Sequence, residues 1–412
     1  IKNRARLIRA LVIPVPRTAL RAYRIPDQPD SVLIQSYHRF PLEITGFGRG
    51  KTANKIANPP HFIPAYTPQA PDRKLICSIP PNADRIFFNL PGLERTFHTE
   101  IRNWSLPHGL TTAQQIWRQP LDTAAIYWEI RDSLLRFLPG VYTLQKDIVI
   151  PAGYQVEIPS HTEINLTKGA RILSRSPIFI YGQADAPVRI WSSDGTGQGL
   201  SVFQTHQKSV IRHTRFEGLT TVQSSGWGLT GAVTFYEADV DIAHCAFIGN
   251  TCEDGLNLVR SKFTLHASLI AETFSDGFDA DFCTGTITKS VFRATGNDGM
   301  DFSGSNIRVF DTRVLQAGDK GISVGEDSKV TVRRLSVDGA VIGAAAKDFS
   351  RLEVAEAQFS NCRTGFAAYQ KKPEFGPATI SASKFRYENI QALHMIEPGS
   401  RLWLNGNLVD QN

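Results

Sequence analysis

Aspartates recur in the middle of the chain at a spacing that would gather their carboxyl groups in space. One set directly precedes glycines that lie 22 residues apart: Asp254, Asp276 and Asp298. A second set follows two of these glycines by two or four residues: Asp279, Asp281 and Asp301. Carboxyl groups this close raise one another's pKa or need a neighbouring cation. Paired carboxyls serve glycoside hydrolysis as acid and as base or nucleophile, so we take the second set as the catalytic candidates.

Polar and cationic residues flank the aspartates at the same repeat positions. We expect this surrounding set to bind substrate: Lys320, Lys347, Glu326, Arg260, Tyr369, Asp276 and Asp298. The two lysines would position acidic groups of the substrate. A lyase or epimerase would instead use a Lys, Arg or Tyr as the proton acceptor, beside a cation that neutralises a uronate.

Structural explanations compete with each functional one. Asp-Gly is ordinary turn chemistry, which favours a structural role for the aspartates that precede glycine. Aspartate inside a strand is disfavoured, which favours a functional role for Asp279, Asp281 and Asp301. Lys320, Lys347 and Glu326 suit internal salt bridges as well as substrate contacts. Several carboxylates together also suit Ca²⁺, so calcium is the one cofactor considered.

A 22-residue repeat determines how these side chains are positioned. Its frame is a series of glycines: Gly255, Gly277, Gly299, Gly321, Gly343 and Gly365. Apolar residues follow each glycine by one and three positions: Leu256 and Leu258, Phe278 and Ala280, Met300 and Phe302, Ile322 and Val324, Ala344 and Ala346, Phe366 and Ala368. Side chains alternate across a strand, and one repeat cannot bury its apolar face without its neighbours. The pattern predicts an all-β, right-handed, single-stranded parallel β-helix over residues 138–412.

Two finer expectations follow from the repeat. We expect the glycine to occupy a sharp turn with positive φ. We also expect a second inward-facing apolar column before the glycine: Phe247, Leu269, Phe292, Val314, Leu335 and Phe359.

Residues 1–137 show no repeat and are expected to form a smaller N-terminal mixed or β cap region. The alternating run 85–90 predicts a strand. Residues 111–137 predict a helix interrupted at Pro120, because Ile126, Ile130, Leu134 and Leu135 form an apolar stripe at helical spacing in its second half.

Composition limits the classes of function. The chain has a net charge of +6, and seven basic residues precede the first acidic residue, Asp27: Lys2, Arg4, Arg6, Arg9, Arg17, Arg21 and Arg24. No recognised nucleic-acid module accompanies this arm, so we expect no nucleic-acid partner. No stretch reaches the roughly 20 apolar residues of a membrane span.

Other potentially reactive residues do not match a metal-site pattern. The five cysteines fit no zinc spacing, and a Cys245–Cys252 disulfide stays open. His206, His213 and His244 lack ligand spacing to a second histidine, so we interpret them as surface or turn residues. Trp227 and Tyr236 suit either sugar stacking or core packing.

Several strings of the repeat resemble a known module. EDGLNLVRSKF, SDGFDADFCTG, NDGMDFSGSNI, GDKGISVGEDS and AAYQKKPEFG look like the right-handed β-helix part of bacterial proteins that carry a CotH-type (spore-coat-kinase-like) domain, within the broader pectin-lyase-like class. The resemblance covers roughly residues 138–385. It implies an elongated outer groove and a polysaccharide ligand, whereas no kinase domain is present and the lyase, polygalacturonase and epimerase signatures are missing.

These observations lead to two main functional hypotheses and a minor third, in which the basic arm docks the protein to an anionic membrane or to nucleic acid. The first is a secreted, periplasmic or cell-surface protein that cleaves glycosidic bonds in a polysaccharide. The second is a non-catalytic polysaccharide-binding or surface-assembly module whose acidic wall is neutralised by a cation or by lysines. The sugar, the linkage and the oligomeric state stay open.

Overall fold

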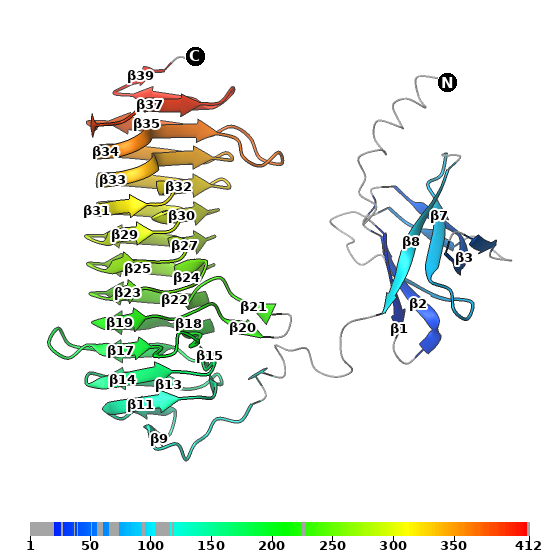
Figure 1. Ribbon diagram of the computed structural model, residues 1–412, viewed down its shortest axis with the longest axis horizontal. Helices are drawn as coiled ribbons and strands as arrows, with labels where there is room; N and C mark the ends of the chain where they lie inside the picture. The colour runs from blue at the N-terminus through cyan, green and yellow to red at the C-terminus, as the bar shows by residue number, and fades with distance from the viewer. Residues whose placement is uncertain are drawn as a thin grey trace. The chain divides into compact units, whose positions relative to one another are not determined.

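The chain forms two compact units, residues 1–111 and 112–412, each with its own hydrophobic core. The computed structural model describes residues 20–25, 28–36, 38, 40–50, 52–55, 61–65, 74–92, 95–103, 116–117, 119–224 and 227–409. All named elements in these residues are β-strands (Figure 1).

The first unit is built on an eight-stranded sheet. Its strands are β1 (Leu20–Ile25), β2 (Gln28–Ser36), β3 (Leu42–Arg49), β4 (Thr52–Lys55), β5 (His61–Ile63), β6 (Lys74–Ser78), β7 (Arg85–Asn89) and β8 (Thr96–Asn103). The order is β4-β3-β7-β8-β1-β2-β6, with β5 paired to β3. Only β1 and β8 pair in parallel. Strand β7 confirms the strand expected over residues 85–90.

The second unit is a solenoid of three parallel sheets, here called A, B and C. Sheet A contains β10 (Leu134–Phe137), β13 (Gln155–Pro159), β16 (Ile178–Tyr181), β25 (Lys262–His266), β28 (Thr284–Thr288), β35 (Thr379–Ser383) and β38 (Arg401–Leu404). Sheet B contains β11 (Gly140–Leu144), β14 (Thr162–Leu166), β17 (Val188–Trp191), β19 (Thr214–Glu217), β23 (Ala246–Ile248), β26 (Leu269–Ala271), β29 (Val291–Thr295) and β36 (Arg386–Glu388). Sheet C contains β12 (Ile148–Ile150), β15 (Ile172–Ser174), β24 (Asp254–Val259), β27 (Asp276–Asp281), β30 (Met300–Ser303), β32 (Lys320–Gly325) and β37 (Ala392–Ile396).

Four long strands bend from one sheet into the next. They are β18 (Leu200–Arg212), β22 (Val233–Ala243), β33 (Lys329–Lys347) and β34 (Arg351–Tyr369), and β31 (Asn306–Ala317) likewise joins A to B. Two short hairpin strands, β20 (Gln223–Ser224) and β21 (Trp227–Gly228), branch off, and β39 (Asn407–Leu408) pairs with β38. The unit has about 12 turns with a spacing of about 22 residues, which confirms the right-handed parallel β-helix.

The expected inward-facing pairs fill the interior. Every apolar pair of the glycine repeat is fully buried, from Leu256 and Leu258 through Phe366 and Ala368. Pairing stacks each residue on its counterpart one coil on, as Phe278 stacks between Leu256 and Met300. One continuous apolar cluster therefore runs from Trp128 to Leu402.

The second apolar column deviates at two coils. Leu269 is only half-buried, and Ile270 instead pairs with Phe247 and Phe292, so the inward-facing position expected for Leu269 was wrong. Leu335 is buried as expected. The residue that pairs with Val314 is Val337, two residues farther on and therefore on the same face of the strand.

The repeated glycines serve close packing rather than a turn. Five of them lie within strands of sheet C, Gly299 directly precedes β30, and none of the six has a positive φ. A Cβ on Gly277 would lie 2.7 Å from the carbonyl oxygen of Gly299, and one on Gly299 would lie 2.8 Å from that of Gly321. The positive-φ prediction was therefore wrong, and contact between neighbouring coils excludes a side chain.

The helix expected over residues 111–137 is also wrong for its second half. Strand β9 (Trp128–Arg131) pairs with β10 in an antiparallel hairpin, and β10 pairs in parallel with β13. Leu135 and Phe137, two residues apart, are both buried, while Ile126 is 86% exposed. Packing in the solenoid therefore follows the two-residue period of a strand and not the helical spacing. Residues 111–115 and 118 lie outside the described residues. The division between the units, at Thr111 and Thr112, lies earlier in the chain than the expected 137/138 boundary.

All five cysteines are buried and free, so Cys245 and Cys252 form no disulfide. Cys283 belongs to an internal ladder in which its N–H donates to Ser305 Oγ at 2.8 Å and the Ser305 N–H donates to Ser328 Oγ at 2.9 Å. The basic arm up to Arg17 lies outside the described residues. The described part of the chain holds no helix of the length and apolarity that a membrane span requires.

Candidate functional site

The outer face of sheet C carries the acidic cluster. Pairing between β24, β27 and β30 aligns its side chains in columns, with Asp254 beside Asp276, Asn257 beside Asp279, and Asp279 beside Asp301. Neighbouring coils are about 4.8 Å apart. The sequence-predicted catalytic residues Asp279, Asp281 and Asp301 therefore do lie together, because alternation points them away from the core.

Asp279 has an environment that favours its protonated form. Burial raises its pKa well above the usual value, and Asp254, Asp281 and Asp301 raise it further. Its Oδ2 accepts a hydrogen bond of 3.3 Å from Asn257 Nδ2, an amide and not a cation. A carboxyl group in this state can donate a proton near neutral pH.

Asp301 has the opposite environment. Lys347 Nζ lies 3.5 Å from its Oδ2, and its Oδ1 accepts the Phe302 N–H at 2.9 Å. The Lys347 side chain runs back along Gly325, whose missing Cβ leaves room for its Cγ, Cδ and Cε. The Lys347 ammonium and the Phe302 N–H are both favourable contacts for carboxyl oxygens.

Lys347 is itself almost fully buried. Burial lowers its pKa, but Asp301 and Glu326 more than offset this, so the pKa lies above its ordinary value. The ammonium group therefore stays charged beneath the carboxylates.

Asp298 and Lys320 form a second ion pair on the same face. Lys320 Nζ lies 3.3 Å from Asp298 Oδ1 and also contacts Asp319. Burial raises the pKa of Asp298 to about 7 despite this partner. Asp276 accepts hydrogen bonds from Asn297 Nδ2 and from the Asp298 backbone N–H, both at 2.7 Å, which matches the structural role expected for an aspartate before glycine.

Asp254 is almost completely removed from solvent. It is 2% exposed, and its Oδ2 accepts a 3.2 Å hydrogen bond from Asn257 Nδ2. Burial raises its pKa to about 7, with Asp276 and Glu253 adding to the shift.

The other end of the columns holds a third acid–lysine pair. Lys372 Nζ lies 2.6 Å from Glu326 Oε1, while Ser303 donates to Glu326 Oε2 at 2.6 Å. These contacts outweigh burial and lower the pKa of Glu326. Asp281 lies beside Ser303, and burial followed by Asp301 and Glu326 raises its pKa.

Two predicted substrate-binding residues lie at the ends of the acidic group. Arg260 is exposed in the turn after β24, donates to Tyr236 Oη at 3.0 Å and lies over the Phe282 ring. Tyr369 pairs with Lys347 in the register. Burial raises the pKa of Tyr369 although Lys320 and Lys347 act to lower it.

The sequence did not single out several partners that shape this wall. Asn257, Ser303 and Asp319 became recognisable only through register and contacts. Ser323 lies next to Asp301 in the register, and its fully buried hydroxyl has no hydrogen-bond partner among the described residues. Within that same part of the chain, no three acidic, histidine or cysteine side chains converge as a metal site.

An aromatic pocket lies on the outer face of the earlier coils of sheet C. It has a volume of about 350 Å³ and is lined by Trp117, Phe203, Trp227, Tyr236 and Arg175, among others. Phe203 pairs with Tyr236, Tyr236 with Val259, and Val259 with Asp281. The pocket and the acidic group therefore share one column of outward positions.

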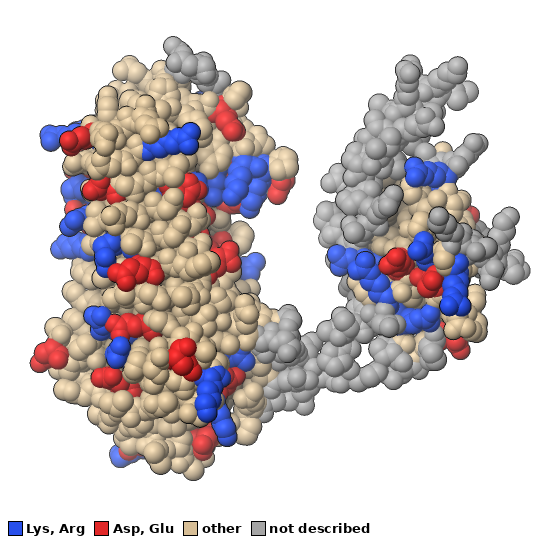
Figure 2. All heavy atoms as spheres, in the orientation of Figure 1, with Lys and Arg blue, Asp and Glu red and all other residues tan. Residues whose placement is uncertain are grey.

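The solenoid surface has mixed charge on the face that Figure 2 shows, with Lys and Arg beside Asp and Glu. No family model and no curated protein match the chain, so the relation to CotH-associated modules stays a prediction.

Solved structures of β-helix proteins are similar to it. A double mutant of the periplasmic alginate epimerase AlgG matches with 13% identity and a TM-score of 0.47, over 65% of this chain and 79% of that one. The pectate lyase Pel9A matches with 11% identity and a TM-score of 0.33, over 60% and 70%. The Dettilon tailspike protein matches with 13% identity and a TM-score of 0.34, over 63% and 56%. These likenesses do not identify a substrate or a reaction.

Proposed function

We propose that this protein cleaves glycosidic bonds in an extracellular or cell-surface polysaccharide at the outer wall of sheet C. Asp279 acts as the general acid and Asp301 as the base or nucleophile. The observation that carries the proposal is their register: two aspartates lie side by side on neighbouring strands. Their surroundings differ, because burial and neighbouring carboxyls raise the pKa of Asp279, whereas Lys347 Nζ lies 3.5 Å from Asp301 Oδ2. Such a pair divides the acid and base roles between two like residues.

The stacking also suggests a stereochemical outcome. Side chains directly in register on parallel coils start about 4.8 Å apart. Retaining glycosidases hold their carboxyls about 5 Å apart, whereas inverting enzymes need about 6.5–9.5 Å for a water molecule. We therefore expect retention, with Asp301 as the nucleophile.

The surrounding residues suit an acidic sugar chain. Lys320 and Lys347 supply positive charge beneath the wall, and Arg260 is exposed at its edge. The aromatic pocket offers ring faces for sugar stacking two to three coils from Asp281. An oligosaccharide extending along the solenoid axis would contact both places.

The test is turnover by Asp279→Asn and Asp301→Asn variants on a panel of acidic and neutral polysaccharides. We expect each variant to lose at least about a hundredfold in kcat, in line with the loss of one acid–base group, while the thermal midpoint changes little. Asp132→Asn, in the exposed β9–β10 turn, is the matched control and should retain full activity. Loss of folding in both site variants with no product from wild-type protein would contradict the proposal.

A non-catalytic binding module is the second candidate, because the lysines Lys320, Lys347 and Lys372 are already engaged with acidic partners. In that case a polysaccharide should bind without forming product, and Asp301→Asn should leave its affinity unchanged. An unsaturated product detected by ultraviolet absorbance would instead indicate a lyase.

A further inference from the structure

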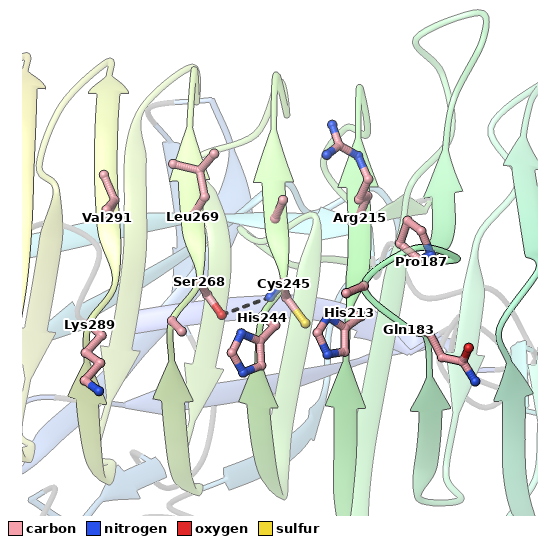
Figure 3. Close-up of a pocket in the computed structure, with 13 residues that line it drawn as sticks. Gln183, Pro187, His213, Arg215, His244, Cys245, Ser268, Leu269, Lys289 and Val291 are labelled. Carbon is pink, nitrogen blue, oxygen red and sulfur yellow. Dashed lines mark hydrogen bonds between the residues drawn. The ribbon is translucent and has the colours of Figure 1, made fainter.

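A separate groove follows the turns that join sheet A to sheet B. It has a volume of about 520 Å³. Figure 3 shows His213 and His244 side by side on adjacent coils, with Lys289 farther along the same row. His213 follows β18, His244 follows β22 and Lys289 follows β28, so the row is on the A–B corner and not on the outer wall of sheet C.

The backbone holds this row in a fixed arrangement. His213, His244 and Lys289 have φ angles of 43°, 56° and 52°, so each occupies the same left-handed turn position. The His213 and His244 rings stack at 4.8 Å with an interplanar angle of 7°, and His266 meets His244 edge-on at 5.5 Å. The sequence spacing of 31 residues between the first two does not reveal this contact.

The described lining of the groove holds basic side chains and no acidic ones. No Asp or Glu is among its lining residues in the described part of the chain, which do include Arg215. Arg212 lies close enough to act on His266.

The acids on the adjacent elements are engaged elsewhere or lie at the edge. On β19, Glu217 is bound by Arg189 and Arg215. On β22, Asp241 accepts from Thr264 and contacts Lys208. On β31, Asp311 pairs with Arg334, and Asp185 is exposed on the turn after β16.

On later coils, the corner between sheets A and B carries acidic residues and arginine instead of histidines. There the turn positions are occupied by Asp311, Arg334 and Glu356, which pair with one another. At the turn positions of His213 and His244, no acidic side chain of the described groove lining neutralises a protonated ring in this way. A negatively charged ligand would provide that neutralisation.

We propose that this groove binds an oxyanion, a carboxylate, sulfate or phosphate, and that it does so when His213 and His244 are protonated. Histidine is the side chain that ordinarily gains its proton between pH 5 and 8. Two stacked imidazolium rings repel each other, and a bound anion removes that cost. Burial lowers the pKa of His266, and the neighbouring His244, Lys289 and Arg212 lower it further.

The proposal is tested by following the imidazole resonances of the full-length protein by NMR as a function of pH. Sodium sulfate and a galacturonate trimer are the two probes, with a neutral glucose trimer as the blank. Both anions should raise the apparent pKa of His213 and His244, and affinity should fall about tenfold per pH unit for each linked proton above that pKa. The probe with the larger effect identifies the source of the oxyanion.

Matched variants make the test specific. His213→Asn and His244→Asn suit the left-handed turn, which asparagine tolerates, and each should weaken anion binding at least tenfold at acidic pH. His206→Asn, an exposed position on β18 outside the groove, should leave binding unchanged. Equal shifts at His206, or no shift with either anion, would overturn the proposal whether or not the protein turns over a polysaccharide.

Discussion

At the scale of single residues, the environment of each carboxyl matters more than the number of carboxyls. Asp301 contacts Lys347 and Asp298 contacts Lys320, whereas Asp254 and Asp279 share the amide of Asn257. A lysine partner alone does not determine the outcome, because burial raises the pKa of both Asp298 and Asp254 to about 7.

Asp254 should make stability depend on pH. Its pKa is about 7 in the folded protein against an ordinary 3.8. Between these values the folded state holds a proton that the unfolded state has released, so stability falls as pH rises from about 4 to 7 and stays low above that. Asp254→Asn should match wild type near pH 4 and exceed it by about 2–4 kcal/mol near pH 8.

Urea unfolding of both proteins across this pH range measures the difference. Asp132→Asn, at an exposed turn, should show no such pH-dependent gain. A constant difference between Asp254→Asn and wild type at every pH would mean that the Asp254 carboxyl has the same pKa in the folded and unfolded states, and would contradict the prediction.

At the scale of elements, the spacing between coils depends on residues without side chains. From Gly255 to Gly343, each repeated glycine of sheet C faces the carbonyl oxygen of the next one, 2.7–2.8 Å from where a Cβ would lie. This contact keeps the strands that carry the aspartates in register. The repeated glycines and the acidic residues therefore belong to the same coils of sheet C.

Gly299→Ala should destabilise the solenoid through overpacking. The added methyl would lie 2.8 Å from both Gly321 O and Val314 Cγ1, and such insertions cost about 1–3 kcal/mol. Thermal and urea unfolding measure the effect. Thr284→Ala, at an exposed position of the neighbouring strand β28, should change stability by less than about 0.5 kcal/mol; an equal effect of the two substitutions would rule out the steric explanation.

At the scale of the whole molecule, the chain contains two separate cores. One is centred on strands β1–β8 and the other runs through the solenoid. The β9–β10 hairpin belongs to the second, through the parallel pairing of β10 with β13. A fragment should therefore include this hairpin in order to fold.

The fragment 112–412 should fold without the first unit. We expect a cooperative melt and a β-type circular dichroism spectrum, because its apolar cluster is continuous from Trp128 to Leu402 and stacking neighbours stabilise each coil. The fragment 138–412 is the comparison, and it should be less stable since it lacks β9 and β10. Aggregation of 112–412 under conditions where the full chain is soluble would contradict the independence of the two units.

The architecture could be predicted from the sequence because apolar and polar residues recur in it at regular intervals. Alternation within a strand and repetition at 22 residues assign Leu256, Phe278 and Met300 to the interior and Asp279 and Asp301 to the outside, and burial agrees. The same logic failed where the period changed by one residue, as at Ile270. It also failed at β9–β10, where apolar residues at helical spacing predicted a helix, whereas β10 pairs as a strand with β13 of the solenoid.

Which charged side chains contact one another is evident only from the tertiary structure. The contact of Lys347 with Asp301 crosses two coils and depends on the space above Gly325, and the His213–His244 stack depends on turn positions 31 residues apart in the sequence. Side-chain charge interactions vary over a few ångströms and with burial, whereas periodicity specifies only the face of a strand. The sequence alone therefore placed the aspartates on one wall, and the folded coils determined their separate partners.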